Sequence, residues 1–63
     1  MWIELHSKGK PSLVNLDKIN LIKPNAKKPS VTNIIYNGGE AITVDENYEQ
    51  IKKLLPLKKA GKA

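Results

Sequence analysis

The chain has no cysteine among its 63 residues, so no disulfide can stabilise its fold. His6 is the only histidine, and with no thiolate available the sequence lacks the usual ligands of a structural zinc site. A chain of this length buries only about 60% of the surface that its unfolded form exposes. Oligomerisation is the remaining common source of added stability. The lack of cysteine also favours a reducing compartment, and we expect a cytoplasmic protein.

Arginine is missing as well, although eleven lysines against six acidic residues give a net charge of +5. Three of the lysines follow Pro56, where we predict a basic flexible tail over residues 58–63. Because arginine supplies the bidentate fork that recognises phosphate and guanine, the basic composition alone is a poor indicator of nucleic-acid recognition. Charged residues interrupt every apolar run, so we expect no signal peptide and no membrane-spanning segment.

Recognisable catalytic and cofactor-binding patterns are also missing. Ser7 adjoins His6, but neighbours on a strand point to opposite faces. Gly38-Gly39 is not followed by the lysine and hydroxyl residue of a phosphate-binding loop. The acidic residues that could act in pairs are explained by the start of a helix: Asp45, Glu46 and Glu49. The sequence therefore predicts a protein that is not an enzyme, with no catalytic, metal or cofactor site.

Alternation of apolar and polar residues predicts two strands near the N-terminus. Residues 2–6 and 12–16 form these strands, and a turn over residues 7–11 joins them, with Gly9 free to adopt a positive φ. Asp17-Lys18 marks a corner or bulge, after which a third strand follows through about Ile22. Two prolines and three lysines then predict a long exposed loop over residues 23–30.

Asn37-Gly38-Gly39 separates two further apolar segments and predicts a β-hairpin. A two-residue loop would set Ile42 beside polar groups, whereas a three-residue loop pairs it with Ile34. A slip of one residue moves every side chain to the other face. We therefore predict the three-residue loop, with Gly39 in the left-handed conformation.

A short helix over about residues 46–55 follows the last strand. Asp45 is its predicted N-cap, acidic residues occupy its first turn and Lys52 and Lys53 its last, as the helix dipole favours. Pro56 disfavours helical geometry at the preceding residue and ends the helix. A helix this short is not stable alone, so it must pack against the sheet.

The fold class predicted by these elements is mainly β: a small antiparallel meander or barrel-like sheet of about five strands with one C-terminal helix. It forms a single domain over residues 1–57. The predicted core contains the apolar residues that share the helix-covered face: Ile3, Leu5, Val14, Leu16, Ile19, Leu21, Ile34, Ile42, Val44, Ile51 and Leu55.

The opposite face of the predicted sheet carries a second apolar set, which is the candidate interface: Trp2, Leu13, Ile22, Val31 and Ile35. A tryptophan with aliphatic neighbours, on a domain too small to cover them, favours an interaction surface. A homodimer is the simplest such interaction. We therefore expect a small non-catalytic interaction or regulatory protein that self-associates, with a further protein partner left open.

The alternative is a protein that binds single-stranded RNA or DNA. Trp2, His6 and Tyr36 would stack on bases, and lysines would contact phosphates. The candidate contacts of this alternative are His6, Lys10, Lys18, Lys27 and Lys28.

Four segments of the chain resemble the small flagellar/swarming-motility FlbD-type proteins: Trp2-Ile3-Glu4-Leu5, Leu13-Val14-Asn15-Leu16-Asp17-Lys18-Ile19, Ile34-Ile35-Tyr36-Asn37-Gly38-Gly39, and Ile42-Thr43-Val44 leading into Tyr48-Glu49-Gln50-Ile51. The resemblance covers residues 2–55 and implies the same order of strands, an Asn-Gly hairpin, a short terminal helix and a non-enzymatic role. Carbon-storage-regulator RNA-binding proteins are similar in length and element order, but the arginines on which they depend are missing from residues 4–6 and 43–46.

Overall fold

The computed structural model describes residues 1–56, which form five strands, a 3-10 turn and one helix. The elements follow in the order β1 (Trp2–Ser7), β2 (Lys10–Asn15), η1 (Leu16–Lys18), β3 (Ile19–Pro24), β4 (Thr32–Tyr36), β5 (Ala41–Val44) and α1 (Tyr48–Leu54). The mainly β fold with a C-terminal helix is therefore confirmed. The tail predicted at residues 58–63 lies outside the described residues.

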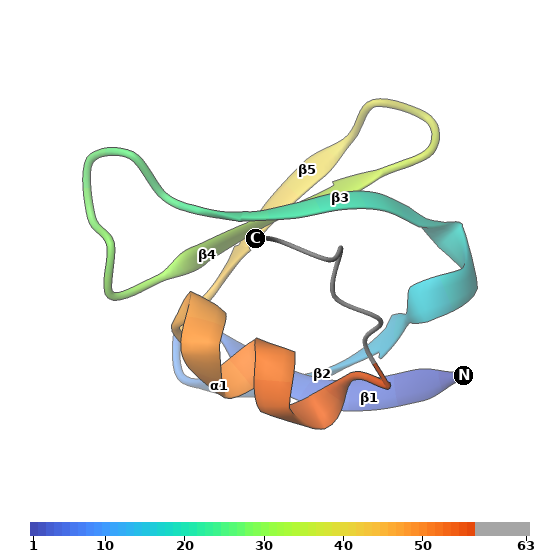
Figure 1. Ribbon diagram of the computed structural model, residues 1–63, viewed down its shortest axis with the longest axis horizontal. Helices are drawn as coiled ribbons and strands as arrows, with labels where there is room; N and C mark the ends of the chain where they lie inside the picture. Colours follow the sequence, from blue (N-terminus) through green and yellow to red (C-terminus); the bar gives the residue numbers. More distant parts are fainter. Residues whose placement is uncertain (57–63) are drawn as a thin grey trace, which may run out of the picture.

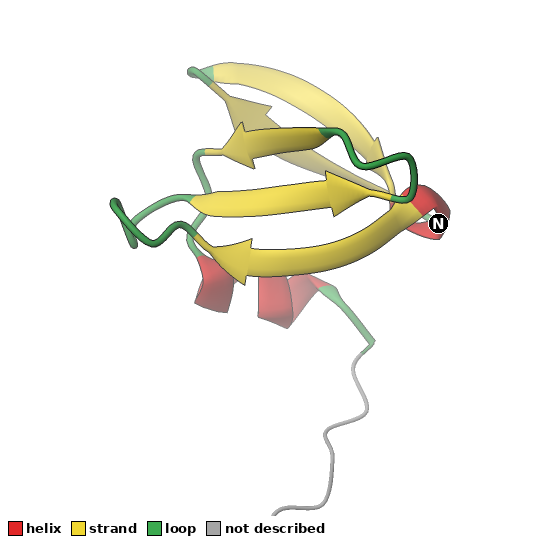
Figure 2. Ribbon diagram, turned by 90° about the horizontal axis from the view of Figure 1, so that it is seen from above, coloured by secondary structure: helices red, strands yellow, loops and turns green. Residues whose placement is uncertain are grey.

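The strands form two antiparallel sheets, a β1–β2 hairpin and a three-stranded sheet in the order β3-β4-β5. β1 lies beside β5, where the N–H of Asp45 donates to the carbonyl of His6 at 2.6 Å. Figure 1 shows the hairpin and the three-stranded sheet facing each other, and Figure 2 shows α1 along one side of the strands. The strands thus form an open barrel, with α1 covering the seam between β2 and β3.

Both sheets and the helix contribute to one core. The fully buried apolar side chains are Leu5, Val14, Ile34, Val44 and Ile51, and the side chains packed against them are Ile3, Ile19, Ile22, Ile42 and Leu55. On β1, Leu5 is buried and Trp2 is exposed, as the alternation of apolar and polar residues predicts. We call this assignment of alternate residues to the two faces the strand phase. The predicted phase also holds on β2, β4 and β5.

β3 does not keep the predicted phase. Leu21, expected in the core, is 46% exposed, whereas Ile22, expected on the interface, packs against the core. The cause is a register shift in the pairing of β3 with β4 between Ile19 and Leu21. A bulge of this kind moves the following side chains to the opposite face. Leu16, another predicted core residue, is only half-buried because it lies in η1 at the edge of the seam.

The second hairpin has the predicted three-residue loop. Ile34 pairs with Ile42, and the N–H of Tyr36 donates to the carbonyl of Glu40 at 2.8 Å. Gly39 has a φ of +92°, in the left-handed region that favours glycine. Face matching between the two strands therefore predicted both the loop length and its glycine conformation.

The helix begins two residues later than predicted, and Asp45 is not its N-cap. Asn47 is the N-cap: its side chain accepts from the N–H of Gln50, whose side chain accepts from the N–H of Asn47. This reciprocal pair is a capping box. Asp45 and Glu46 lie ahead of the helix and are free to contact the β1–β2 hairpin. Pro56 follows the end of the helix, as predicted.

Candidate functional site

The outer face of the β1–β2 hairpin carries the two most exposed large apolar side chains of the described residues. Trp2 is 62% exposed and Leu13 is 67% exposed. Because Trp2 pairs with Asn15 and Glu4 pairs with Leu13, Trp2 and Leu13 are diagonal neighbours on one face. We call these two residues the hairpin patch.

The other three residues of the predicted interface lie elsewhere. Ile22 packs against the core, and Val31 is half-buried ahead of β4. Ile35 is half-buried on the outer face of the three-stranded sheet, where it pairs with Leu21 and Ala41. Since the hairpin and the three-stranded sheet turn their inner faces toward one core, their outer faces point in different directions (Figure 1). The structure therefore separates the predicted interface into two surfaces.

The lysines of the nucleic-acid alternative are dispersed. Lys10 begins β2, whereas Lys18 lies in η1 beyond the other end of that strand, and Lys27 and Lys28 lie in the β3–β4 loop. The ring of His6 is bound to a carboxylate rather than free to face a phosphate. These lysines and Trp2 therefore lie on different elements of the described chain rather than along one strand. The geometry gives this alternative no specific support.

Two acidic residues tie the β1–β2 hairpin to the segment between β5 and α1. The carboxylate of Asp45 accepts from the N–H groups of Lys8 and Gly9, at 3.2 and 2.7 Å. Lys8 and Gly9 have φ angles of +53° and +78°, so the first hairpin is a tight two-residue turn rather than the five-residue turn predicted. A lysine in the left-handed region is strained, and the hydrogen bond to Asp45 holds it there.

Glu46 forms the second part of this connection. Its carboxylate accepts from the N–H of His6 at 2.9 Å and contacts the Nδ1 atom of the His6 ring at 2.7 Å. The hydrogen bond to Glu46 raises the pKa of His6 above its ordinary value of 6.5, and attraction to Glu4 and Asp45 acts in the same direction. Burial alone would raise the pKa of Glu46, but the hydrogen bonds from His6 outweigh it and lower that pKa below 4.5. The pair is therefore most stable when His6 is protonated and Glu46 is ionised.

We expect Glu46→Gln to lower the melting temperature most between about pH 4.5 and pH 6.5. The stabilisation from a raised histidine pKa is complete below pH 6.5 and is lost as the pH rises through the folded-state value. The stabilisation from a lowered carboxyl pKa is complete above pH 4.5 and is lost as the pH falls through its folded-state value. Thermal unfolding from about pH 3 to pH 9 measures the difference.

Glu49→Gln is the matched control, because Glu49 pairs with a lysine, Lys52, rather than with a histidine. Its effect on the melting temperature should stay constant between about pH 5.5 and pH 9. A constant effect of Glu46→Gln over the same interval would contradict the conclusion that Glu46 stabilises the fold through His6.

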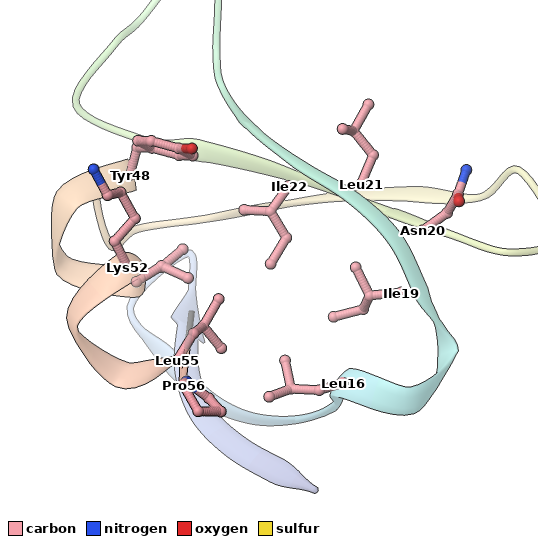
Figure 3. Close-up of a pocket in the computed structure, with 10 residues that line it drawn as sticks. Leu16, Ile19, Asn20, Leu21, Ile22, Tyr48, Lys52, Leu55 and Pro56 are labelled. Atoms are coloured by element: carbon pink, nitrogen blue, oxygen red, sulfur yellow. The ribbon is translucent and has the colours of Figure 1, made fainter. Parts of the chain in front are cut away.

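An apolar groove of about 410 Å³ lies between α1, β3 and η1 (Figure 3). Figure 3 shows four aliphatic side chains pointing into this space: Leu16 of η1, Ile19 and Ile22 of β3, and Leu55, which follows α1. The lining residues are Leu16, Ile19, Asn20, Leu21, Ile22, Tyr48, Ile51, Lys52, Leu55 and Pro56. We call this space the seam groove, because it follows the open seam of the barrel.

The seam groove could not be predicted from the sequence. The spacing of Tyr48, Ile51 and Leu55 indicates a helix face that packs on a sheet, and it does not show how completely the two surfaces meet. The groove depends on the bulge in β3, which sends Ile22 rather than Leu21 inward. No local pattern in the sequence specifies that bulge.

Within residues 1–56, no group of three histidine, cysteine or acidic side chains is arranged to bind a metal ion. The helix of these residues is too short and too polar to cross a membrane. No known protein-family model matches the chain, and no curated protein or solved structure is significantly similar to it. The surfaces described above are therefore the basis for inferring function.

Proposed function

We propose that the chain is a small non-catalytic interaction domain that self-associates through the hairpin patch. The observation that supports this most directly is the exposure of Trp2 and Leu13 as neighbours on one face of the β1–β2 hairpin. Tryptophan is highly buried on average in folded proteins. It is also the residue type most enriched at the energetic centres of protein interfaces.

A twofold dimer is the simplest assembly that covers this patch, because it pairs the surface with its own copy. Glu4 and His6 lie on the same face of β1 and would form the polar rim that such interfaces have. The dimer would also supplement a core that has only five fully buried apolar side chains among the described residues. The FlbD-type resemblance, which implies a non-enzymatic role, accords with this proposal.

Leu13→Lys is expected to convert the dimer to a monomer without affecting the fold. The new ammonium group would be buried against the partner's apolar surface, whereas in the monomer it would face water, as Leu13 does now. Trp2→Ala should weaken dimerisation by about 2 kcal/mol, or roughly 30-fold in the dissociation constant. Sedimentation velocity at micromolar concentration, with circular dichroism of each variant, measures both effects.

Leu54→Lys is the matched control, because Leu54 is 51% exposed on α1, away from the hairpin patch. It should leave the sedimentation coefficient unchanged. The proposal is wrong if the wild-type chain sediments only as a monomer, or if Leu54→Lys and Leu13→Lys weaken association equally.

A further inference from the structure

Asn37 and Gly38 lie at the tip of the hairpin that joins β4 to β5 (Figure 1). The N–H of Gly39 donates to the carbonyl of Tyr36 at 2.8 Å, so Asn37 and Gly38 are the two central residues of a β-turn. Both are exposed, and a Cβ added at Gly38 would meet no atom within 4 Å. Water therefore reaches the peptide bond that joins them.

This dipeptide has the composition that most favours loss of the asparagine amide. The side chain of an asparagine is attacked by the backbone nitrogen of the following residue, and glycine hinders that nitrogen least because it has no Cβ. Asn37 is the one asparagine of the sequence that is followed by glycine. The attack also requires that hydrogen bonds hold neither the side-chain amide nor the attacking nitrogen.

The hydrogen bonds of the turn leave both reacting groups available. The N–H of Asn37 donates to the carbonyl of Lys18 at 2.9 Å, which fixes the backbone ahead of the reacting bond. Within residues 1–56, neither the N–H of Gly38 nor the side-chain amide of Asn37 has a hydrogen-bond partner. The side chain can therefore rotate toward the Gly38 nitrogen without breaking a contact of the described chain.

The other asparagines lack this combination. Four of them use the side-chain amide in hydrogen bonds: Asn15, Asn25, Asn33 and Asn47. Asn25 is held most firmly, because its Oδ1 accepts from the N–H groups of Lys27 and Lys28, each at 2.9 Å, and its Nδ2 donates to Asn33 at 3.0 Å. Asn20 is followed by a leucine, in a strand that pairs with β4.

We propose that Asn37 is a site of spontaneous deamidation, which converts it to aspartate or isoaspartate. Hydroxide removes the proton of the Gly38 nitrogen, which bonds to Cγ of Asn37. The Cγ–Nδ2 bond breaks, and the amide leaves as ammonia with a proton from water, which regenerates the hydroxide. Water then opens the resulting five-membered imide at one of its two carbonyls, without oxidation or reduction. This site is distant from the hairpin patch in the chain and goes beyond the proposed function.

The two products should affect the hairpin differently. Aspartate adds a negative charge and keeps the length of the loop. Isoaspartate carries the main chain through the former side chain, which adds one carbon to the three-residue loop that sets Ile34 opposite Ile42. The isoaspartate form should therefore have the lower melting temperature of the two.

Peptide mass spectrometry of the full chain, after incubation at physiological temperature and mildly alkaline pH, measures the reaction at each asparagine. Asn37 should be the first to show the mass change from an amide to an acid. Chromatography of the peptides separates aspartate from isoaspartate. The rate at Asn37 should rise with pH, because hydroxide removes the proton of the attacking nitrogen.

Two variants separate the effect of the following residue from the effect of hydrogen bonding. Gly38→Ala should slow deamidation of Asn37 at least about tenfold and keep the fold, because Gly38 has no positive φ and has room for a Cβ. Ala26→Gly places a glycine after Asn25, at an exposed position. In the folded variant, Asn25 should still react at least about tenfold more slowly than Asn37, because its hydrogen bonds must break first. In urea that unfolds the chain, the two rates should become similar.

Two results would overturn the proposal. One is a folded wild-type chain in which Asn37 reacts no faster than the other asparagines, or reacts only after unfolding in urea. The other is an equal rate at Asn25 and Asn37 in folded Ala26→Gly, which would show that the hydrogen bonds give no protection. Leu13→Lys, which tests self-association, should leave the rate at Asn37 unchanged.

Discussion

Replacing Ile34 with alanine is expected to lower the free energy of unfolding by about 2–5 kcal/mol. Ile34 is fully buried in the central strand of the three-stranded sheet, paired with Ile22 on one side and Ile42 on the other. Removing its outer carbons would leave a cavity that three strands border. Because domains have about 0.05–0.15 kcal/mol of stability per residue, a chain of 63 residues has about 3–9 kcal/mol in total. The substitution should therefore leave much of the protein unfolded.

Ile35→Ala is the matched control, because the same side chain is removed at the next position of the same strand. Ile35 is half-buried on the outer face, so its loss should cost less than half as much. Urea unfolding followed by far-ultraviolet circular dichroism measures both variants. Trp2 fluorescence is a poorer probe, since that side chain is exposed in the folded state. Equal losses of unfolding free energy for the two variants would contradict the placement of Ile34 on the inner face of β4 and Ile35 on its outer face.

That strand phase could be predicted from the sequence wherever apolar and polar residues alternate without interruption. On β1, Ile3 and Leu5 are separated by Glu4, so only one face can be apolar. The Asn37-Gly38-Gly39 turn then fixed the register of β4 with β5, because only one loop length matched the apolar faces. Local alternation and the residues of the turn were sufficient to predict which side chains of these strands face the core.

β3 shows where this reasoning stops. Leu21 and Ile22 are adjacent and equally apolar, so either could face the core. The choice is made by pairing with β4, where a bulge after Ile19 sends Ile22 inward. The start of the helix presents the same difficulty. Asp45 and Asn47 are both good N-cap residues, and Asp45 instead binds the turn at Lys8 and Gly9, some 36 residues away in the chain.

The candidate surfaces differ in the same way: one could be predicted from the sequence and the other could not. Exposure of Trp2 and Leu13 follows from alternation on two regular strands, and the sequence predicted it. The seam groove and the contacts of Asp45 and Glu46 arise between elements that are distant in the chain. Their formation depends on how the hairpin, the three-stranded sheet and α1 meet. Such arrangements are set by packing rather than by local sequence pattern.

Thr32→Val is expected to lower the free energy of unfolding by about 1–3 kcal/mol, although it changes only a hydroxyl to a methyl group. Thr32 is the one fully buried polar residue of the described chain, and its Oγ1 donates to the carbonyl of Glu46 at 2.8 Å. Valine would preserve the volume but leave that carbonyl without this donor in the interior. Thermal and urea unfolding of the variant measure the loss.

Thr32→Ser is the matched variant, because it keeps the hydroxyl and removes a methyl group, at a cost of about 0.8 kcal/mol or slightly more for a small cavity. We expect the serine variant to be the more stable of the two. The opposite order would show that Thr32 acts through packing alone.

The two Thr32 variants should also differ at His6, which Thr32 does not touch. The hydroxyl of Thr32 fixes the backbone of Glu46, and the carboxylate of Glu46 raises the pKa of His6. Loss of the hydroxyl should therefore let the pKa of His6 fall toward its ordinary value, whereas Thr32→Ser should preserve the shift. Titration of the His6 ring resonances by NMR measures this effect in the folded fraction of each variant. An unchanged His6 titration in Thr32→Val would mean that the Glu46 carboxylate is held by the hairpin alone, through the N–H of His6.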